Sequence, residues 1–225
     1  MFENILGNEK NKNILEKSIK LNKFSHSYIF WGIEGIGKKL IAKQFAENIL
    51  GLEKQIDLSN VPDFQLIEPI DGKVRIEQIR EMQKKVAEKP IISNKKVYII
   101  DNADTMTTEA QNCLLKTLEE PPEYATIILI CTNEDNLLST IKSRCTRMHF
   151  DSISTEEVRK YMKQNFPEQE ISENIINLSQ GSIGKVIKLN FHLMILILML
   201  QILVVLLKFL INNFELLLSL CLHCL

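Results

Sequence analysis

The sequence carries almost no net charge and has few cysteines. Its 27 basic residues are balanced by 28 acidic ones over 225 residues. This balance argues against a free-standing polyelectrolyte that binds nucleic acid, although it allows a local basic face or a subunit of a larger complex. The cysteines form no even, regularly spaced framework, which predicts free thiols in a reducing cytoplasm. They are Cys113, Cys131, Cys145, Cys221 and Cys224.

The N-terminus lacks the continuous apolar core of a secretory signal. MFENILGNEKNKNILEKS is rich in charged residues, so we expect no signal peptide. The length allows one large domain or two small ones. Composition then divides the chain, because residues 1–189 mix charged and apolar residues, whereas residues 190–225 contain only Lys208 and Glu215 as formal charges at neutral pH.

Strand-like and helix-like segments alternate along the first part of the chain. Continuous apolar runs predict strands at residues 28–31, 63–69, 95–104, 125–133 and 146–150. Amphipathic spacing predicts helices at residues 8–20, 39–51, 75–90 and 107–120, with a short helical turn at 137–145. Apolar runs of this kind suit strands covered on both faces. The alternation therefore predicts an α/β, doubly wound parallel sheet, and the helical pattern of residues 152–189 predicts a small helical appendage.

The stretch GIEGIGKK, which begins at Gly32, nearly matches the phosphate-binding pattern G-x-x-x-x-G-K-[ST]. Gly32, Gly37 and Lys38 stand where the pattern requires them, and Gly35 adds a further glycine. Successive backbone N–H groups and a helix N-terminus suit phosphate, and Lys38 would reach the β and γ phosphates. The last position should carry a hydroxyl to hold Mg²⁺, and Lys39 stands there instead.

Two other interpretations of this loop stay open. One is an ordinary strand-to-helix turn that uses glycine for positive φ. The other is a dinucleotide fingerprint, because the glycines run G-x-x-G-x-G; no acidic residue closes a clear second strand about twenty residues further on. The phosphate loop predicts ATP or ADP as the ligand, and the sequence leaves its occupancy open.

The run KVYIIDNAD places carboxylates at the end of a predicted strand. In nucleotide hydrolases of this architecture, a carboxylate at the position of Asp101 orients Mg²⁺. An acidic residue would follow to polarise the attacking water, but this chain has Asn102, and an amide cannot act as a general base. The metal-holding hydroxyl and the catalytic carboxylate are thus missing together, which predicts a site that does not hydrolyse. Alternatively, Asp101 and Asp104 only solvate a loop.

Polar residues follow several of the predicted strands. The glycine loop, Asp101 and Asp104, Asn133 and the turn 143–145 all fall at strand ends or just after. Ligands of doubly wound sheets bind at the carboxyl ends of the strands, but whether these residues share one side depends on the topology. Arg144 in the turn is either a surface charge or an arginine finger for a neighbouring subunit.

Three segments together resemble a known family. SHSYIFWGIEGIGKK, KKVYIIDNADTMTTEAQNCLLKTLEEPP and LLSTIKSRC are similar to the delta-prime subunits of the bacterial DNA polymerase III clamp loader, in the AAA+ class. The resemblance covers roughly residues 1–187, and LLKTLEEPP followed by SRC is its most specific part. It implies an AAA+ type P-loop domain over residues 1–151 and a partial helical lid over residues 152–189.

The resemblance also implies a role. The clamp loader is a five-membered ring of AAA+ subunits that opens the sliding clamp and places it on primed DNA. The chain would be its stator, with motor ATPase and delta-type subunits as partners, with the clamp and DNA reached through the complex, and with little hydrolysis of its own. Arg144 would act in trans, Asn133 would be the sensor, and Lys185 is an uncertain second sensor. The alternative is an autonomous AAA+ ATPase.

Many relatives carry a zinc module with four cysteines, but residues 51–64 contain no cysteine, so we expect no zinc site and no other metal site. Cys221, His223 and Cys224 give at most three ligands, which we interpret as coincidence. The family's C-terminal collar domain has no counterpart in residues 190–225 either, and without it we expect poor assembly.

The apolar tail has three interpretations. A membrane anchor needs around 20 apolar residues, and residues 193–207 supply a shorter run interrupted by Gln201. A buried core helix is the second, although apolar residues cover every face. The third, which we favour, is a frameshifted translation that truncates the protein before the collar. We therefore expect a cytoplasmic protein, and a membrane-tethered nucleotide-binding protein only if the tail is genuine.

Overall fold

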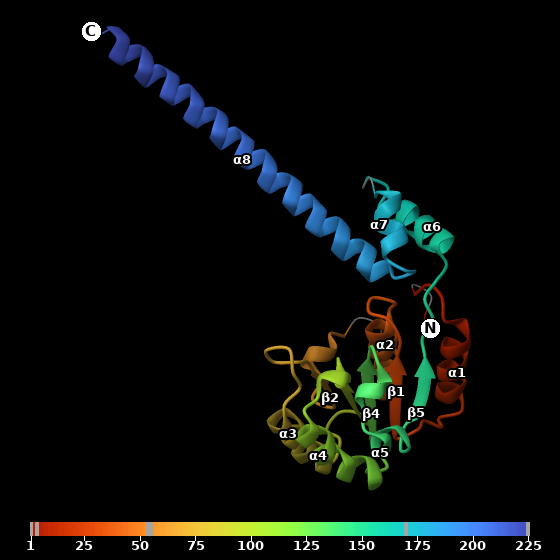
Figure 1. Ribbon diagram of the computed structural model, residues 1–225. Coiled ribbons are helices and arrows are strands. Elements are labelled where there is room, and N and C mark those ends of the chain that lie inside the picture. Colours follow the sequence, from red (N-terminus) through yellow and green to blue (C-terminus); the bar gives the residue numbers. More distant parts are fainter. Residues whose placement is uncertain (1, 3–4, 53–55, 169–170, 224–225) are drawn as a thin grey trace.

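A parallel five-stranded sheet forms the centre of the molecule (Figure 1). The computed structural model describes residues 2, 5–52, 56–168 and 171–223, and side chains as far as residue 204. The strand order is β2-β3-β4-β1-β5, and all neighbours are parallel, which confirms the predicted sheet. The strands are β1 (Ser27–Trp31), β2 (Phe64–Ile67), β3 (Lys96–Ile100), β4 (Ala125–Cys131) and β5 (Thr146–His149).

Helices cover both faces of this sheet, as the continuous apolar strands predicted. On one face Phe30 and Ile128 belong to a core shared with α1 and α2, whereas their neighbours Ile29 and Ile127 belong to a second core with α3 and α4. Successive strand residues point to opposite faces, so strands without polar alternation require two cores. The helices are α1 (Glu9–Lys20), α2 (Lys38–Leu50), α3 (Ile76–Ala87), α4 (Thr108–Glu119) and α5 (Ser139–Lys142), with 3₁₀ turns η1 (Leu58–Asn60), η2 (Ala103–Thr105) and η3 (Glu134–Asn136).

A small helical lid follows the sheet. It consists of α6 (Thr155–Asn165), α7 (Glu173–Leu178) and the first turns of α8 (Ile183–His223) around a separate buried cluster that includes Val158, Met162 and Val186. Ser154 caps α6 by accepting from the Glu157 N–H, and the Glu157 carboxylate accepts from the Ser154 N–H. This capping box fixes the start of the lid.

The last helix runs through the predicted boundary at residue 190 without a break. α8 is 41 residues long and extends away from the sheet and lid as a rod (Figure 1). Every described side chain from Phe191 to Val204 is exposed. The interpretation of the tail as a buried core helix is therefore wrong for these residues. Residues 183–204 are long and apolar enough to cross a membrane by length and composition, with a mean hydropathy of 2.1 and 11% of the window buried.

Candidate functional site

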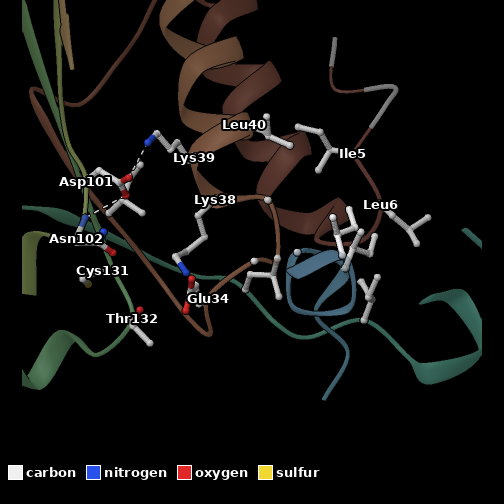
Figure 2. A pocket seen from close by; sticks show the side chains of 18 of the residues that line it. Ile5, Leu6, Glu34, Lys38, Lys39, Leu40, Asp101, Asn102, Cys131 and Thr132 are labelled. Carbon is white, nitrogen blue, oxygen red and sulfur yellow. Dashed lines mark hydrogen bonds and ion pairs between the residues drawn. The ribbon is translucent and has the colours of Figure 1, made fainter. Parts of the chain in front are cut away.

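A cavity of about 420 Å³ lies at the carboxyl ends of β1, β3 and β4 (Figure 2). The glycine loop and the loop after β3 form its polar end. The N-terminal segment and the lid form an apolar end, with Ile5, Leu6, Tyr161 and Ile187 in its walls. The volume falls within the usual range of roughly 300–1,000 Å³ for small-ligand sites. A polar end beside an apolar end suits a nucleotide, whose phosphates and base differ in the same way.

The backbone of the glycine loop depends on its glycines. Gly35 and Gly37 have φ values of 80° and 91°, a region that residues with a Cβ rarely adopt. A Cβ on Gly32 would lie 2.3 Å from the carbonyl oxygen of Phe150. Gly37 is the N-cap residue of α2, and because glycine has no side chain it cannot cap the helix with a hydrogen bond. The first N–H groups of α2 therefore face the cavity without a side-chain cap, an arrangement that suits an anion.

Lys38, which the sequence assigned to the β and γ phosphates, lies inside the glycine loop. Its side chain is buried, and its Nζ donates to the carbonyl oxygens of Gly32 and Ile33 at 2.6 and 2.7 Å. Burial lowers the pKa of Lys38, against the opposing effect of nearby acidic groups that include Asp101. The ammonium is thus held at the base of the cavity by the loop itself.

Lys39 forms an ion pair with the carboxylate that the sequence assigned to Mg²⁺. Its Nζ lies 2.8 Å from Asp101 Oδ2 (Figure 2). The same Nζ lies 2.5 Å from Glu68 Oε1. Burial works to lower the pKa of Lys39, but its hydrogen bonds with Asp101 and Glu68 raise it overall. A charged ammonium therefore occupies the space between the glycine loop and the end of β3.

These residues fit a nucleotide but do not fit Mg²⁺. The N–H groups of the loop and Lys38 supply a phosphate cradle. The metal, by contrast, would find no hydroxyl at position 39, and Asp101 is already paired. Asn102, with φ 48°, stands at the N-cap position of η2 without a side-chain cap bond and lines the cavity. Among the described residues, no cluster of three or more His, Cys, Asp or Glu side chains could hold a metal ion; Cys221, His223 and Cys224 lie outside the described side chains.

The other predicted polar residues do not line the cavity. Asp104 Oδ2 accepts from the N–H groups of Thr132 and Asn133, at 3.1 Å each, and so ties η2 to the end of β4. Asn133 Oδ1 accepts from the Asp135 N–H as the cap of η3. The polar side chain in the cavity wall at the end of β4 is Thr132. The sequence indicated a polar residue at the end of this strand, but it did not distinguish Thr132 from the adjacent Asn133.

The lid contacts the tip of the glycine loop directly. Ser182 Oγ donates to the Glu34 carbonyl at 2.7 Å, and the Gly184 N–H donates to the Gly35 carbonyl at 2.9 Å. Lys185, the predicted second sensor, is not among the residues that line the cavity; Ile183, Gly184 and Ile187 are. These contacts could not be predicted from the sequence, because their acceptors are backbone carbonyl groups far away along the chain.

The cysteines are free where the structure describes them, as predicted, at Cys113, Cys131 and Cys145. Cys131 lies in the cavity wall at the end of β4. Burial raises the pKa of the Cys131 thiol to about 12, so it stays protonated at neutral pH. A protonated thiol is a poor nucleophile, so Cys131 contributes shape to the cavity and no covalent chemistry.

Arg144 lies at the opposite edge of the sheet from the cavity. Its backbone carbonyl accepts from Ser27 Oγ at the start of β1, whereas the glycine loop follows the end of β1. The guanidinium forms an ion pair with Glu119 at 2.8 Å and donates to the Thr140 carbonyl, with about a third of the side chain exposed. The turn 143–145 therefore does not share a side with the other strand-end residues, and Arg144 cannot act on this chain's own cavity.

Comparisons with known proteins agree with this geometry. The family described as DNA polymerase III, delta subunit, matches residues 7–154. The chain is 33% identical over 177 residues to the Bacillus subtilis DNA polymerase III subunit delta', covering 73% of this chain and 53% of that protein. It is 30% identical over 201 residues to the Haemophilus influenzae subunit tau/gamma, covering 81% and 29%. The chain thus spans about half or less of these two relatives.

Solved structures share the fold at low identity. A DNA polymerase III gamma subunit-related protein from Thermotoga maritima is similar with a TM-score of 0.61 and 24% identity, covering 78% of this chain and 57% of that one. The Thermotoga maritima RuvB Holliday junction branch migration motor is similar with a TM-score of 0.57 and 17% identity, covering 82% and 61%. The architecture is therefore the AAA+ type P-loop fold that the sequence predicted.

Proposed function

The chain belongs to the DNA polymerase III delta-subunit family of clamp-loader proteins, and from that premise we propose that it is a stator of the delta-prime kind. It helps to load the sliding clamp on primed DNA, hydrolyses little or no ATP itself, and supplies Arg144 to the ATP site of an adjacent motor subunit. Delta-type subunits are the other partners in the ring. The site of action is the cytoplasm.

The observation that carries this proposal is the ion pair between Lys39 and Asp101. Hydrolysis in this architecture uses a metal ion that bridges the phosphates and a residue that positions the attacking water. Here an ammonium holds the metal's carboxylate, and Asn102 stands where a general base would be. The ion pair and the missing general base both weaken hydrolysis by this chain, and neither affects a role in assembly.

The position of Arg144 supports the role in trans. The side chain is partly exposed, on the sheet edge opposite the cavity, and its present partner Glu119 is itself half exposed. An exposed ion pair of this kind is worth at most about 1 kcal/mol. Glu119 can therefore release the guanidinium at little cost when the γ-phosphate of a neighbouring subunit is near.

The test is Arg144→Ala in a clamp loader reconstituted with its motor and delta-type subunits. Fully engaged arginine fingers are worth roughly 10³–10⁵ in rate. Because one site among several is affected, we expect a smaller fall in DNA-stimulated ATPase and clamp loading, at least about twofold. Arg144→Lys should not restore the rate, since lysine lacks the planar fork of arginine.

Arg147→Ala is the matched control, because Arg147 lies on the adjacent β5, pairs with Glu134 and is also exposed. Unchanged loading rates in Arg144→Ala, with unaltered thermal unfolding, would refute the trans role. The isolated chain should show no ATP turnover above background. Turnover that disappears in Lys38→Ala would favour an autonomous AAA+ ATPase instead.

The exposed apolar surface of α8 favours a second candidate function, a membrane-tethered nucleotide-binding protein. In that case the AAA+ module would act at a bilayer surface. Membrane association distinguishes the two candidates.

A further inference from the structure

We propose that Lys39 replaces the magnesium ion of this site, so that the chain binds ADP or ATP without a divalent metal. The inference deepens the proposed function, because it concerns the nucleotide site of the same AAA+ module. It concerns binding alone and requires no bond to break.

The position of Lys39 is the first argument. The residue lies in the first turn of α2, at the place in the loop pattern where a hydroxyl would hold the metal. Its side chain extends to the end of β3, where Nζ lies 2.8 Å from Asp101 Oδ2. A metal ion would bridge the same two elements. The lysine therefore makes, within one side chain, the connection that Mg²⁺ makes in a hydrolytic site.

The hydrogen-bonding capacity of the ammonium is the second argument. An ammonium has three donors and no acceptor. Asp101 and Glu68 accept from Lys39 in the structure, which leaves one N–H. The side chain is about a third exposed and lines the cavity. The remaining donor is thus available to a phosphate oxygen.

The charge of the polar end is the third argument. Lys39 pairs with both Asp101 and Glu68 and balances one of their two negative charges, and Lys188 Nζ lies 3.5 Å from Glu34. Lys38 supplies a further positive charge at the base of the loop. The three lysines together balance the three carboxylates, so phosphate meets no net negative charge from these six side chains. An entering Mg²⁺ would have to displace an ammonium from Asp101, and it would find no hydroxyl at position 39.

The experiment is a calorimetric titration of the full chain, kept in mild detergent, with ADP, once in the presence of EDTA and once with excess Mg²⁺. For the natural sequence we expect dissociation constants that agree within about threefold, a difference below the 1.4 kcal/mol of a tenfold change. Bound ADP should also raise the thermal unfolding midpoint in EDTA, because a ligand that binds only the folded state stabilises it.

Lys39→Thr is the informative variant, because it restores the hydroxyl and frees Asp101. Its affinity for ADP in EDTA should fall by about tenfold or more and should recover when Mg²⁺ is added, since one charge-assisted contact is lost and the metal site returns. Lys43→Thr is the control. This variant makes the same substitution one turn further along α2, at a residue that does not line the cavity. The affinity of Lys43→Thr for ADP should therefore not change in either buffer.

Three results would overturn the inference. Binding of ADP to the natural sequence only with Mg²⁺ would mean that the metal displaces Lys39. Binding by Lys39→Thr but not by the natural sequence would mean that the ion pair closes the site. An absence of binding in every folded variant would mean that the cavity takes no nucleotide. None of these results affects the Arg144 assay, so the proposed function stands or falls separately.

Discussion

At the scale of single residues, one buried carboxylate joins two segments of the sheet domain. Asp63, directly before β2, is 1% exposed. Its Oδ1 accepts from the Ile91 N–H, and its Oδ2 accepts from the N–H groups of Ile92 and Ser93, at 2.7 to 2.8 Å. The loop after α3 belongs to no strand, and these bonds to Asp63 satisfy three of its backbone N–H groups. Because the donors belong to the backbone, the sequence of that loop gave no sign of them.

We predict that Asp63→Asn lowers the free energy of unfolding by about 1–3 kcal/mol, the usual cost of weakening hydrogen bonds to a buried group. An amide has only one acceptor oxygen, so at least one of the three N–H donors loses its partner. Urea unfolding at neutral pH measures the loss. Asp71→Asn is the control, because Asp71 is exposed and forms an exposed ion pair with Arg75. An equal loss in both variants would contradict the prediction.

The same residue predicts a dependence of stability on pH. Burial works to raise the pKa of Asp63, but the three backbone donors and Lys96 lower it below its ordinary value. A carboxyl whose pKa is lower in the folded state contributes stability above its unfolded pKa of about 3.9 and loses it as the pH falls further. We therefore expect the difference in unfolding free energy between the natural chain and Asp63→Asn to shrink below about pH 4.

At the scale of elements, the lid is held on the glycine loop by two glycines. A Cβ on Gly184 would lie 2.7 Å from the Gly35 Cα, closer than real contacts allow. Gly184 belongs to the first turn of α8 and has no positive φ. An alanine is therefore compatible with the helix and would meet only the loop. Gly35, with φ 80°, is less informative, because any substitution there is strained.

We predict that Gly184→Ala separates the lid from the glycine loop. Alanine favours a helix over glycine by about 1 kcal/mol, so helix propensity alone would stabilise α8, and any loosening must come from the contact. Hydrogen exchange of residues 182–187 should become faster, because the Gly184 N–H loses its bond to Gly35. Lys185→Ala is the control. Exchange that stays unchanged or slows in Gly184→Ala would show that the contact does not hold the lid.

At the scale of the whole molecule, the protein has two parts of different character. The sheet and lid bury their apolar residues in three clusters, whereas α8 exposes apolar residues on every side from Phe191 to Val204. A helix in a protein groove needs an apolar face, while a helix that is apolar all round suits lipid or self-association. Val186 and Asn190 are buried in the described lid, so a bilayer could accept α8 only after them.

We predict that the full chain associates through α8. In aqueous buffer it should elute as large assemblies, and mild detergent should reduce them, because exposed apolar surface is costly in water. If the helix inserts, the chain should also float with phospholipid vesicles and resist extraction by high salt, which removes electrostatic binding. A chain ended after Asn190 is the control and should be monomeric. A monomeric full chain without detergent would contradict the prediction.

Resequencing the gene across the codons for residues 183–225 tests our proposal that the tail is frameshifted. A second frame that continues with charged, amphipathic helices would support the frameshift and favour the stator over the membrane-tethered protein. Confirmation of this frame without such a continuation would make α8 a genuine element, and the vesicle experiment would then decide between the two candidate functions.

Sequence patterns were enough to predict the parallel sheet, the order of strands and helices along the chain and the glycine loop. They also revealed that Lys39 and Asn102 stand where a hydrolytic site has a hydroxyl and a carboxylate. These features are local, because apolar runs, glycine spacing and the residue after a strand depend on neighbours a few positions away. The family resemblance was carried by the same kind of short segment, and the match to residues 7–154 confirms it.

Which of these residues meet became clear from the folded chain. Ser182 and Glu34, which form the bond between lid and loop, lie 148 positions apart, and the Lys39 pair joins α2 to the ends of β2 and β3. Parallel strands carry their amino ends to one edge and their carboxyl ends to the other, which separates Arg144 from the cavity. Such contacts depend on the strand order, which is a property of the folded sheet and not of any single segment.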